Sequence, residues 1–310
     1  MHHLLVASVV EKQPSLASSF YSVNGVQLHV KEAGPADGPV LLLLHGFPEF
    51  WYGWRKQISY FAERGYRVVV PDQRGYNRSS KPPGIKPYQL KELTQDMVEL
   101  IRALGAEKVL LVGHDWGAIV VWSLLTEHRE LISRAVIINV PHPSVMWRTL
   151  RRRPGQMLRS WYVFFLQLPW LPEALLRRRQ YGLLKNTLRH TSRPGTLSEP
   201  EIAQYEEAWS QPGSLTAMLN WYRALRYQRN PSETDHHRLH YITTPVLLIW
   251  GKKDAFLLPE MAAASLRKCV RGHLLLFEEA THWVHLEKSD EVNRAMEAFL
   301  GEVGGLNASR

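Results

Sequence analysis

The chain has 310 residues, of which 45% are hydrophobic and 22% are charged, a composition that suits a packed globular protein and excludes a disordered one. Its only cysteine, Cys269, excludes an internal disulfide, and no run of about 18 apolar residues is present to cross a membrane. The net charge of +9 would suit nucleic acid or an anionic membrane. The basic runs at 148–153 and 177–179 lie within apolar helical patterns, however, so we interpret them as solvated helix faces and expect no nucleic-acid partner.

Strand and helix signals alternate through the first part of the chain. Asn24-Gly25 separates two strand-like runs within residues 20–30 and predicts a hairpin. Continuous apolar runs then predict strands that are buried on both faces, and apolar residues at helical spacing predict helices between them. The strands are expected at 40–44, 66–70, 109–112 and 135–140, and the helices at 90–104 and 116–125. This alternation is typical of a doubly wound, mostly parallel α/β sheet.

The pattern changes after Pro141. Residues 143–240 show helical periodicity and turns without a convincing buried strand. Strand signals resume at 245–250 and 273–277, and residues 291–300 predict a closing helix. We therefore expect one α/β core made of residues 20–142 and 241–305, interrupted by a helical cap at 143–240 that lies over the sheet.

A candidate nucleophile lies in the segment Gly113-His-Asp115-Trp-Gly117. A buried strand, a tight turn flanked by glycines and then a helix form the context of the G-x-S-x-G nucleophile elbow, here with aspartate in place of serine. Alone the motif is weak, because an aspartate after a strand is more often a helix N-cap. Its chemistry is nevertheless specific: aspartate attacking an alkyl carbon forms an ester that water can cleave, whereas serine would form an ether.

Hydrolysis of such an ester requires a base, an acid that orients it, and donors for an oxyanion. Asp254 follows the predicted strand at 245–250, and His282 follows the last one, which gives the chain order nucleophile, acid, histidine. The loop after the strand at 40–44 would supply the backbone N–H of Phe47 as one oxyanion donor, and Trp116 would supply the other. Pro48 fixes the turn and is a candidate for a cis bond.

Several linked motifs closely resemble the epoxide hydrolases of the α/β-hydrolase family. The resembling segments are His45-Gly-Phe-Pro-Glu49 with Trp51 and Trp54, Asp72-Gln-Arg-Gly-Tyr76, Gly113-His-Asp-Trp-Gly117, Gly251-Lys-Lys-Asp254 and His282-Trp283. The resemblance, from about residue 20 to about residue 300, implies conversion of epoxides to diols through an ester on Asp115. It also implies two cap tyrosines, Tyr162 and Tyr222, that donate hydrogen bonds to the epoxide oxygen. We expect the substrate pocket to include His45, Pro48, Trp51, Trp221 and Trp283.

Three alternatives remain open at this point. Haloalkane dehalogenases share the aspartate elbow, although many of them have asparagine where Phe47 stands and lack the paired tyrosines. Fluoroacetate dehalogenases carry arginine after the nucleophile, where this chain has Trp116. A non-catalytic binding protein of the same fold is the third alternative, although such proteins typically lose a triad member.

Partners and location follow from the same features. We expect a small lipophilic epoxide as substrate, no metal or organic cofactor, and either a monomer or a homodimer. Asp235, His236, His237 and His240 could be a metal site, but we interpret them as solvated loop residues. Residues 1–19 lack the pattern of a signal peptide, so we expect a cytoplasmic protein.

Overall fold

A computed structural model of the chain describes residues 16–227 and 241–301. Its centre is an eight-stranded sheet with the order β1-β2-β4-β3-β5-β6-β7-β8. Only the two pairings of β2, with β1 and with β4, are antiparallel; all other neighbours are parallel. The strands are β1 Ala17–Val23, β2 Val26–Ala33, β3 Val40–Leu44, β4 Arg67–Pro71, β5 Val109–His114, β6 Ile132–Ile138, β7 Val246–Gly251 and β8 Gly272–Phe277.

The composition of the strands accounts for this arrangement. All five residues of β3 and all six of β5 and β7 are buried, as expected of strands covered on both faces. The β1–β2 hairpin turns at Asn24-Gly25, where both residues have positive φ and give a turn that matches strand twist. The strands predicted from apolar runs are confirmed, and their bounds agree within two residues except in β6. β6 begins at Ile132, three residues earlier than expected, and ends before Asn139, whose left-handed φ of 53° takes the backbone out of the extended region.

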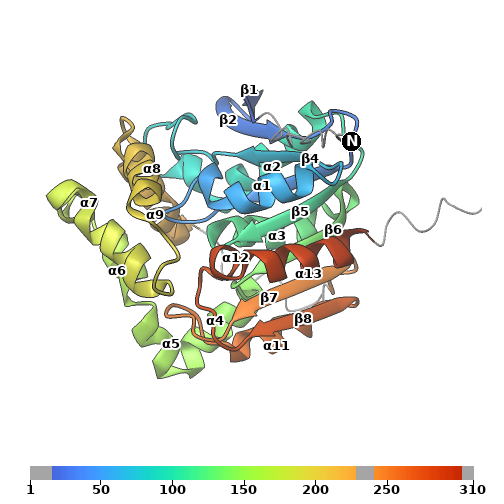
Figure 1. Ribbon diagram of the computed structural model, residues 1–310. Coiled ribbons are helices and arrows are strands. Elements are labelled where there is room, and N and C mark those ends of the chain that lie inside the picture. Colours follow the sequence, from blue (N-terminus) through green and yellow to red (C-terminus); the bar gives the residue numbers. More distant parts are fainter. Residues whose placement is uncertain (1–15, 228–240, 302–310) are drawn as a thin grey trace, which may run out of the picture.

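Helices cover both faces of the sheet (Figure 1). On one face, α1 (Arg55–Ala62) and α13 (Ser289–Gly301) pack over alternate residues of the central strands. On the other face, α2 (Leu90–Ala103), α3 (Trp116–Glu127) and α11 (Glu260–Leu266) contribute to the larger core cluster. Short helical turns, η1 Trp51–Trp54, η2 Lys86–Tyr88, η3 Arg129–Leu131 and α12 Val284–Glu287, complete the connections.

A helical insertion separates β6 from β7, as expected, and stands beside the sheet at the left of Figure 1. Its elements are α4 Pro143–Arg152, α5 Pro154–Arg159, α6 Trp161–Leu166, α7 Leu171–Thr191, α8 Glu199–Ser210, α9 Ser214–Arg223 and η4 Ala224–Tyr227. α7 is interrupted at residues 178–181, where the backbone is not helical. The domain boundaries at 142/143 and 240/241 stay predictions, and the histidine cluster at 235–240 lies outside the described residues.

The apolar residues of the sheet and of the helices that cover it are buried in the core. Among residues 16–227 and 241–301, no helix is long and apolar enough to cross a bilayer. Two core clusters, one on each face of the sheet, take up the apolar residues of the strands and of the helices that cover them. The carboxyl ends of β3, β5, β6, β7 and β8 therefore form a rigid edge that faces the helical insertion.

Candidate active site

Asp115 occupies the turn between β5 and α3. Its backbone has φ 49° and ψ −123°, a left-handed conformation that is strained for a residue with a side chain. The turn closes tightly because its glycines permit close backbone approach: a Cβ on Gly117 would lie 2.2 Å from the Leu44 carbonyl oxygen. The result is a nucleophile elbow that lifts the Asp115 carboxylate clear of the sheet.

One oxygen of this carboxylate is already held by the backbone. The Phe47 N–H donates to Oδ1 of Asp115 at 2.7 Å, and the Phe47–Pro48 peptide bond is cis. No hydrogen bond from the Trp116 N–H to this carboxylate occurs within the described part of the chain, so Trp116 as the second donor stays a prediction. The contact with Phe47 leaves Oδ2 as the oxygen that is free to react.

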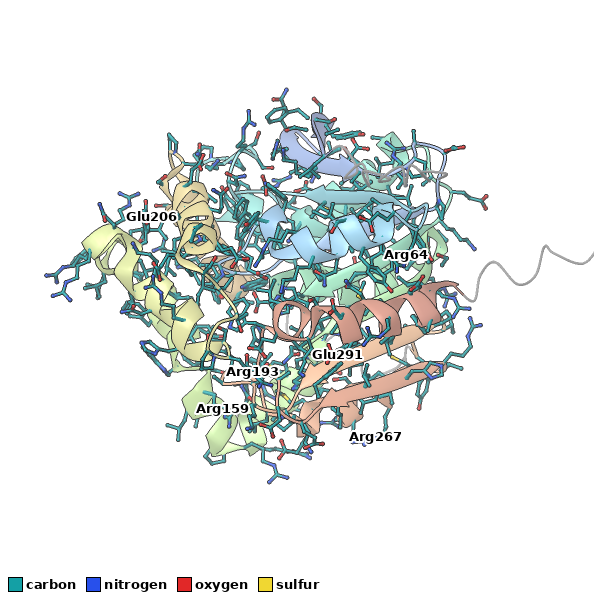
Figure 2. All side chains as sticks on the ribbon, in the orientation of Figure 1. Arg64, Arg159, Arg193, Glu206, Arg267 and Glu291 are labelled. Carbon is teal, nitrogen blue, oxygen red and sulfur yellow. The ribbon has the colours of Figure 1, made fainter. Side chains whose placement is uncertain are left out.

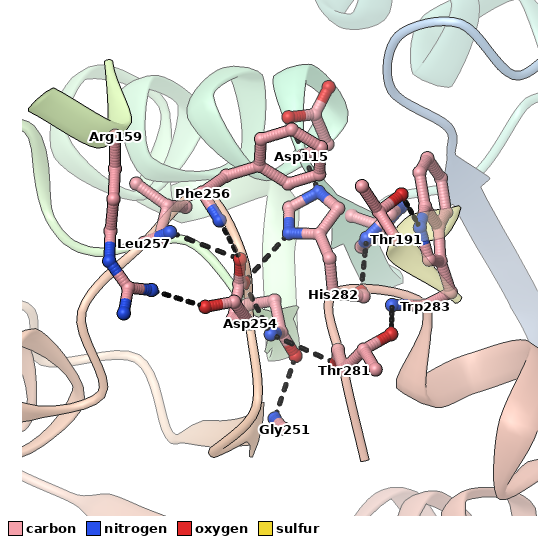
Figure 3. Close-up of polar contacts among 12 residues, drawn as sticks. Asp115, Arg159, Thr191, Gly251, Asp254, Phe256, Leu257, Thr281, His282 and Trp283 are labelled. Carbon is pink, nitrogen blue, oxygen red and sulfur yellow. Dashed lines mark hydrogen bonds and ion pairs between the residues drawn. The ribbon is translucent and has the colours of Figure 1, made fainter. Parts of the chain in front are cut away.

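His282 and Asp254 complete a triad with Asp115 (Figure 3). Nε2 of His282 lies 3.6 Å from Oδ2 of Asp115, and Nδ1 donates to Oδ2 of Asp254 at 2.8 Å. The three residues come from the ends of β5, β7 and β8, and they meet because parallel strands present their carboxyl ends at one edge. His282 and Asp254 are both buried, so these charges are screened weakly by solvent.

Asp254 is held by several donors, among them one that we did not predict. The N–H groups of Phe256 and Leu257 donate to its Oδ1 at 2.7 and 3.0 Å. The amide of Asn139 donates to its Oδ2 at 2.7 Å and accepts from the Gly251 N–H at 3.0 Å. Asn139 follows β6, so its place at the end of a buried strand was the signal that could have identified it.

The electrostatics of the triad favour a resting ion pair. Burial alone would lower the pKa of His282, but the charges of Asp254 and Asp115 and their hydrogen bonds raise it to about 10. Burial alone would raise the pKa of Asp115, but its hydrogen bond and attraction to His282 hold it below the usual range. At neutral pH, Asp115 is therefore an ionised carboxylate, the form that acts as a nucleophile.

The two tyrosines predicted for the cap lie together above Asp115. Tyr162 belongs to α6 and Tyr222 to α9, and their ring centroids are 6.2 Å apart. The Tyr222 ring also packs edge-on against Phe47 at 5.3 Å. Burial and the nearby Asp115 carboxylate raise the pKa of both phenols. Both hydroxyls therefore keep their protons and can act as hydrogen-bond donors.

A cavity of about 350 Å³ joins these groups. This volume is within the range that holds a small organic ligand. Its polar lining comprises Asp115, His282, the two tyrosines, Arg159 and two threonines, and its remaining walls are mostly apolar. The lining residues are Phe47, Pro48, Asp115, Leu158, Arg159, Trp161, Tyr162, Phe165, Leu166, Leu176, Leu183, Leu184, Thr187, Thr191, Tyr222, Ala255, Phe256, His282 and Trp283.

Pro48 and Trp283 thus line the cavity, but three residues expected there do not. His45 is fully buried below the oxyanion loop, where its Nε2 accepts from the Gln73 N–H at 3.1 Å. Trp51 lies to the side, with the Lys31 ammonium 5.1 Å from its ring. Trp221 donates to a backbone carbonyl of the core at 2.9 Å. Because neighbours on a helix point in different directions, Trp221 faces the core where Tyr222 faces the cavity.

A buried polar network supports the site from below. Nδ1 of His114 lies 3.0 Å from a Glu49 oxygen, and its Nε2 lies 2.9 Å from the carbonyl oxygen of His282. The Tyr205 hydroxyl of α8 donates to the other Glu49 oxygen at 3.0 Å. Burial alone would raise the pKa of Glu49, but His285 and His114 hold it well below its usual range. The network links the loop after β3, the elbow after β5, the loop after β8 and helix α8 of the insertion.

Three side chains of this network region, Glu49, His114 and His285, are the group among the described residues that could hold a metal ion. Ligand atoms of Glu49, His114 and His285 lie within 4.8 Å of one another, and all three are buried. Burial and the charge of His114 lower the pKa of His285 to about 4, so His285 is a neutral imidazole. Glu49 already accepts from His114 and Tyr205, so we interpret Glu49 and His114 as part of a structural hydrogen-bond network, beside which His285 packs with Nε2 3.4 Å from Glu49.

Comparison with known proteins agrees with this geometry. Residues 39–289 match the family described as alpha/beta hydrolase fold. The chain is 44% identical to the AB hydrolase superfamily protein YfhM of Bacillus subtilis over 91% of this chain and 96% of that protein. It is 36% identical to human epoxide hydrolase 4 over 93% of this chain and 80% of that one.

Solved structures give the same relationship. The Bacillus megaterium epoxide hydrolase in complex with an inhibitor superposes with a TM-score of 0.83 and 30% identity, covering 91% of this chain and all of that one. Epoxide hydrolase VrEH1 of Vigna radiata gives a TM-score of 0.81 and 32% identity over 93% and 98% of the two chains. The chain therefore belongs to the alpha/beta hydrolase fold family and is closely related to its epoxide hydrolases.

Proposed function

We propose that this protein is an epoxide hydrolase that converts lipophilic epoxides to vicinal diols through a covalent ester on Asp115. The observation that carries the proposal is the pair Tyr162 and Tyr222, two protonated phenols that line one apolar cavity with an ionised aspartate. Opening an epoxide generates an alkoxide, which is a poor leaving group unless a donor meets its charge. Displacement of a halide requires no proton, so paired phenols suit the epoxide better.

In the first step, Oδ2 of Asp115 attacks a ring carbon and the carbon–oxygen bond of the epoxide breaks. The electrons of that bond pass to the ring oxygen, which takes a proton from one of the two tyrosines. The product is a hydroxyalkyl ester, and Oδ1 remains at the Phe47 N–H as the ester carbonyl oxygen. The Coulomb attraction between Asp115 and His282 ends at this point, because an ester carries no charge.

In the second step, His282 takes a proton from water, and the hydroxide attacks Cγ of Asp115. Loss of the Asp115 charge lowers the pKa of His282, so the imidazolium of the resting pair first gives its proton to the tyrosinate left by the first step and becomes a neutral base. Asp254 keeps the ring oriented through Nδ1. The tetrahedral oxyanion forms on Oδ1 at the Phe47 N–H, with Trp116 as the second donor. Collapse breaks the bond between Cγ and Oδ2, and the departing alkoxide takes the proton of the new Asp115 carboxyl group. The diol leaves with Oδ2, and the resting pair of Asp115 carboxylate and His282 imidazolium is restored.

Trapping of the ester tests the mechanism. The variant His282→Gln should accumulate the covalent intermediate, so mass spectrometry after incubation with styrene oxide should find substrate mass on a peptide that contains Asp115. The double variant with Asp115→Asn is the matched control and should carry no adduct. A His282→Gln protein without any adduct, tested with substrates that the wild type hydrolyses, would show that the covalent mechanism is wrong.

Variants of the two tyrosines, together with a comparison of substrates, test whether the leaving group is an epoxide oxygen or a halide. Each of Tyr162→Phe and Tyr222→Phe should lower kcat by about 100-fold, as removal of one oxyanion donor does in other enzymes. Tyr181→Phe is the control, because Tyr181 lies in the same insertion and its hydroxyl bonds a backbone carbonyl away from the cavity. Wild type should form diol from styrene oxide and release no bromide from a bromoalkane. Bromide release without diol would assign the site to a dehalogenase, and no turnover of either would favour a binding protein.

A further inference from the structure

The helical insertion exposes a set of large apolar side chains that the site does not use in full. Leu158 is 73% exposed, Trp161 64%, Phe164 63% and Trp170 73%. Figure 2 shows the side chains of α6 and α7 projecting from the outer edge of the molecule, away from the sheet. We call this set the cap patch; it comprises Met157, Leu158, Trp161, Phe164, Leu168, Trp170 and Leu183.

The cap patch is larger than scattered surface apolar residues would be. Trp161 and Phe164 are three residues apart in α6 and both are exposed, so they share one outward face of that helix. An aromatic side chain has roughly 150–250 Å² of surface, and at these exposures Trp161, Phe164 and Trp170 alone present on the order of 400 Å². That area matches the largest patches of monomeric proteins, which mark sites of interaction.

Positive charge accompanies the cap patch along the chain. Residues 143–191 contain ten Lys and Arg but a single acidic residue, Glu173. Glu173 is already paired with Arg223 at 2.7 Å. The arginines at 151–153 and 177–179 are exposed, and within residues 16–227 and 241–301 none of them forms a salt bridge. An exposed apolar surface accompanied by arginines without acidic partners is the pattern of a surface that lies on a membrane interface.

The chemistry of the patch selects among possible occupants. A second copy of the chain would bring a second set of uncompensated arginines against the first, and like charges oppose that contact. An anionic lipid bilayer offers phosphate groups to the arginines and an apolar layer to the tryptophans at the same time. Leu158, Trp161 and Leu183 line the cavity and are also at least 50% exposed, so the mouth of the cavity opens within the cap patch.

We propose that the cap patch docks the protein on the surface of an anionic lipid bilayer, with the mouth of the cavity turned toward the lipid. Docking needs only the exposed side chains and their charge, so it does not depend on the reaction proposed for the cavity. If both hold, a lipophilic substrate dissolved in the bilayer reaches the cavity without crossing bulk water. The basic runs are then the charged border of a binding surface rather than solvated helix faces.

Flotation of the intact protein with lipid vesicles tests the docking. Wild type should float with vesicles of phosphatidylcholine mixed with phosphatidylglycerol and stay behind with phosphatidylcholine alone, and added salt should weaken the binding. Replacing Arg151, Arg152 and Arg153 by Glu should lower partitioning by about 100-fold or more, since each arginine near an anionic surface contributes about 1 kcal/mol. The pair Trp161→Ser and Phe164→Ser should lower it by about tenfold or more.

A matched control reverses three charges elsewhere. Arg102, Lys108 and Arg129 are exposed and lie at the amino edge of the parallel strands, opposite the insertion, so their change to Glu should leave partitioning within about twofold of wild type. Equal loss in this control would show that net charge alone drives binding and would overturn the proposal.

Failure of wild type to float with anionic vesicles would also overturn the proposal. So would sedimentation of a dimer that Trp161→Ser converts to a monomer, because a second copy would then occupy the patch. Partitioning is measured without substrate, so its failure is distinct from loss of hydrolysis.

Discussion

Neutralising Asp115 should change the acid–base behaviour of His282. The substitution Asp115→Asn keeps the size of the side chain and removes its charge, as formation of the ester would. The pKa of His282 is about 10 in the intact protein, where two carboxylates outweigh the opposing effect of burial. With one of these charges gone, the pKa of the imidazole should fall into the range in which a base works at neutral pH.

The size of the fall follows from one distance. Nε2 of His282 and Oδ2 of Asp115 are 3.6 Å apart. Two unit charges at this separation attract by about 4.6 kcal/mol at an effective dielectric constant of about 20. Since one pKa unit corresponds to about 1.4 kcal/mol, removal of the charge should lower the pKa of His282 by about 3, to about 7. Asp254 keeps it from falling further, because that contact is retained.

Nuclear magnetic resonance on protein labelled with nitrogen-15 in its histidines can follow the ring nitrogens of His282 through the titration. The spectrum of His282→Gln assigns the signal by its absence. Intact mass must show that residue 115 is still Asn, because the site that hydrolyses an ester could also hydrolyse this amide. Glu297→Gln is the control, since Glu297 belongs to a surface ion pair with Arg64.

Titration of His282 within about one pH unit of the same value in wild type and Asp115→Asn would refute this prediction. A comparable fall in the pKa of His282 in Glu297→Gln would refute it equally. In the first case, the charge of Asp115 would not control the base. The change of role that we propose for His282 between the two steps would then have no electrostatic origin.

Three further predictions follow from the same geometry. Gly46→Ala should lower kcat at least about tenfold while the protein stays folded by circular dichroism, because a Cβ there would lie 2.2 Å from the Cβ of Asp115 and displace the nucleophile. Glu49→Gln should lower the free energy of unfolding in urea by about 3 kcal/mol, because it removes the buried partner of His114; a loss below about 1 kcal/mol would contradict this. The stability that His282 gains from its carboxylates should be complete below about pH 6.5 and disappear as pH rises toward 10, so the difference in unfolding free energy between wild type and His282→Gln should shrink over this interval.

Much of the core could be predicted because buried strands have short, continuous apolar sequences. β3, β5 and β7 are almost uniformly apolar, and the expected ranges agree with theirs within two residues. The elbow, Asp254 and His282 follow from chain order, since they come after β5, β7 and β8 and parallel strands bring their ends together. These predictions rest on local pattern and topology, which a single sequence carries.

The direction of individual side chains could not be predicted in the same way. His45, Trp51 and Trp221 stand in or beside the right motifs but point away from the cavity. Asn139 and the Glu49 network are polar groups that become visible only when segments distant in sequence are placed together. Nothing in the apolar pattern of the insertion distinguishes leucines and tryptophans that face the core from those that face solvent.

The bond from the Phe47 N–H to Oδ1 of Asp115 has a consequence for where the oxygen of the product comes from. With Oδ1 held in place, only the Oδ2 position meets the substrate, and under the proposed reaction that atom leaves inside the diol. A water oxygen refills the position each time. Each diol would therefore carry the oxygen of the water consumed one turnover earlier, while the atom at Oδ1 stays with the protein. The oxygen of each water molecule would therefore spend one turnover in the Asp115 carboxylate before it leaves in a diol.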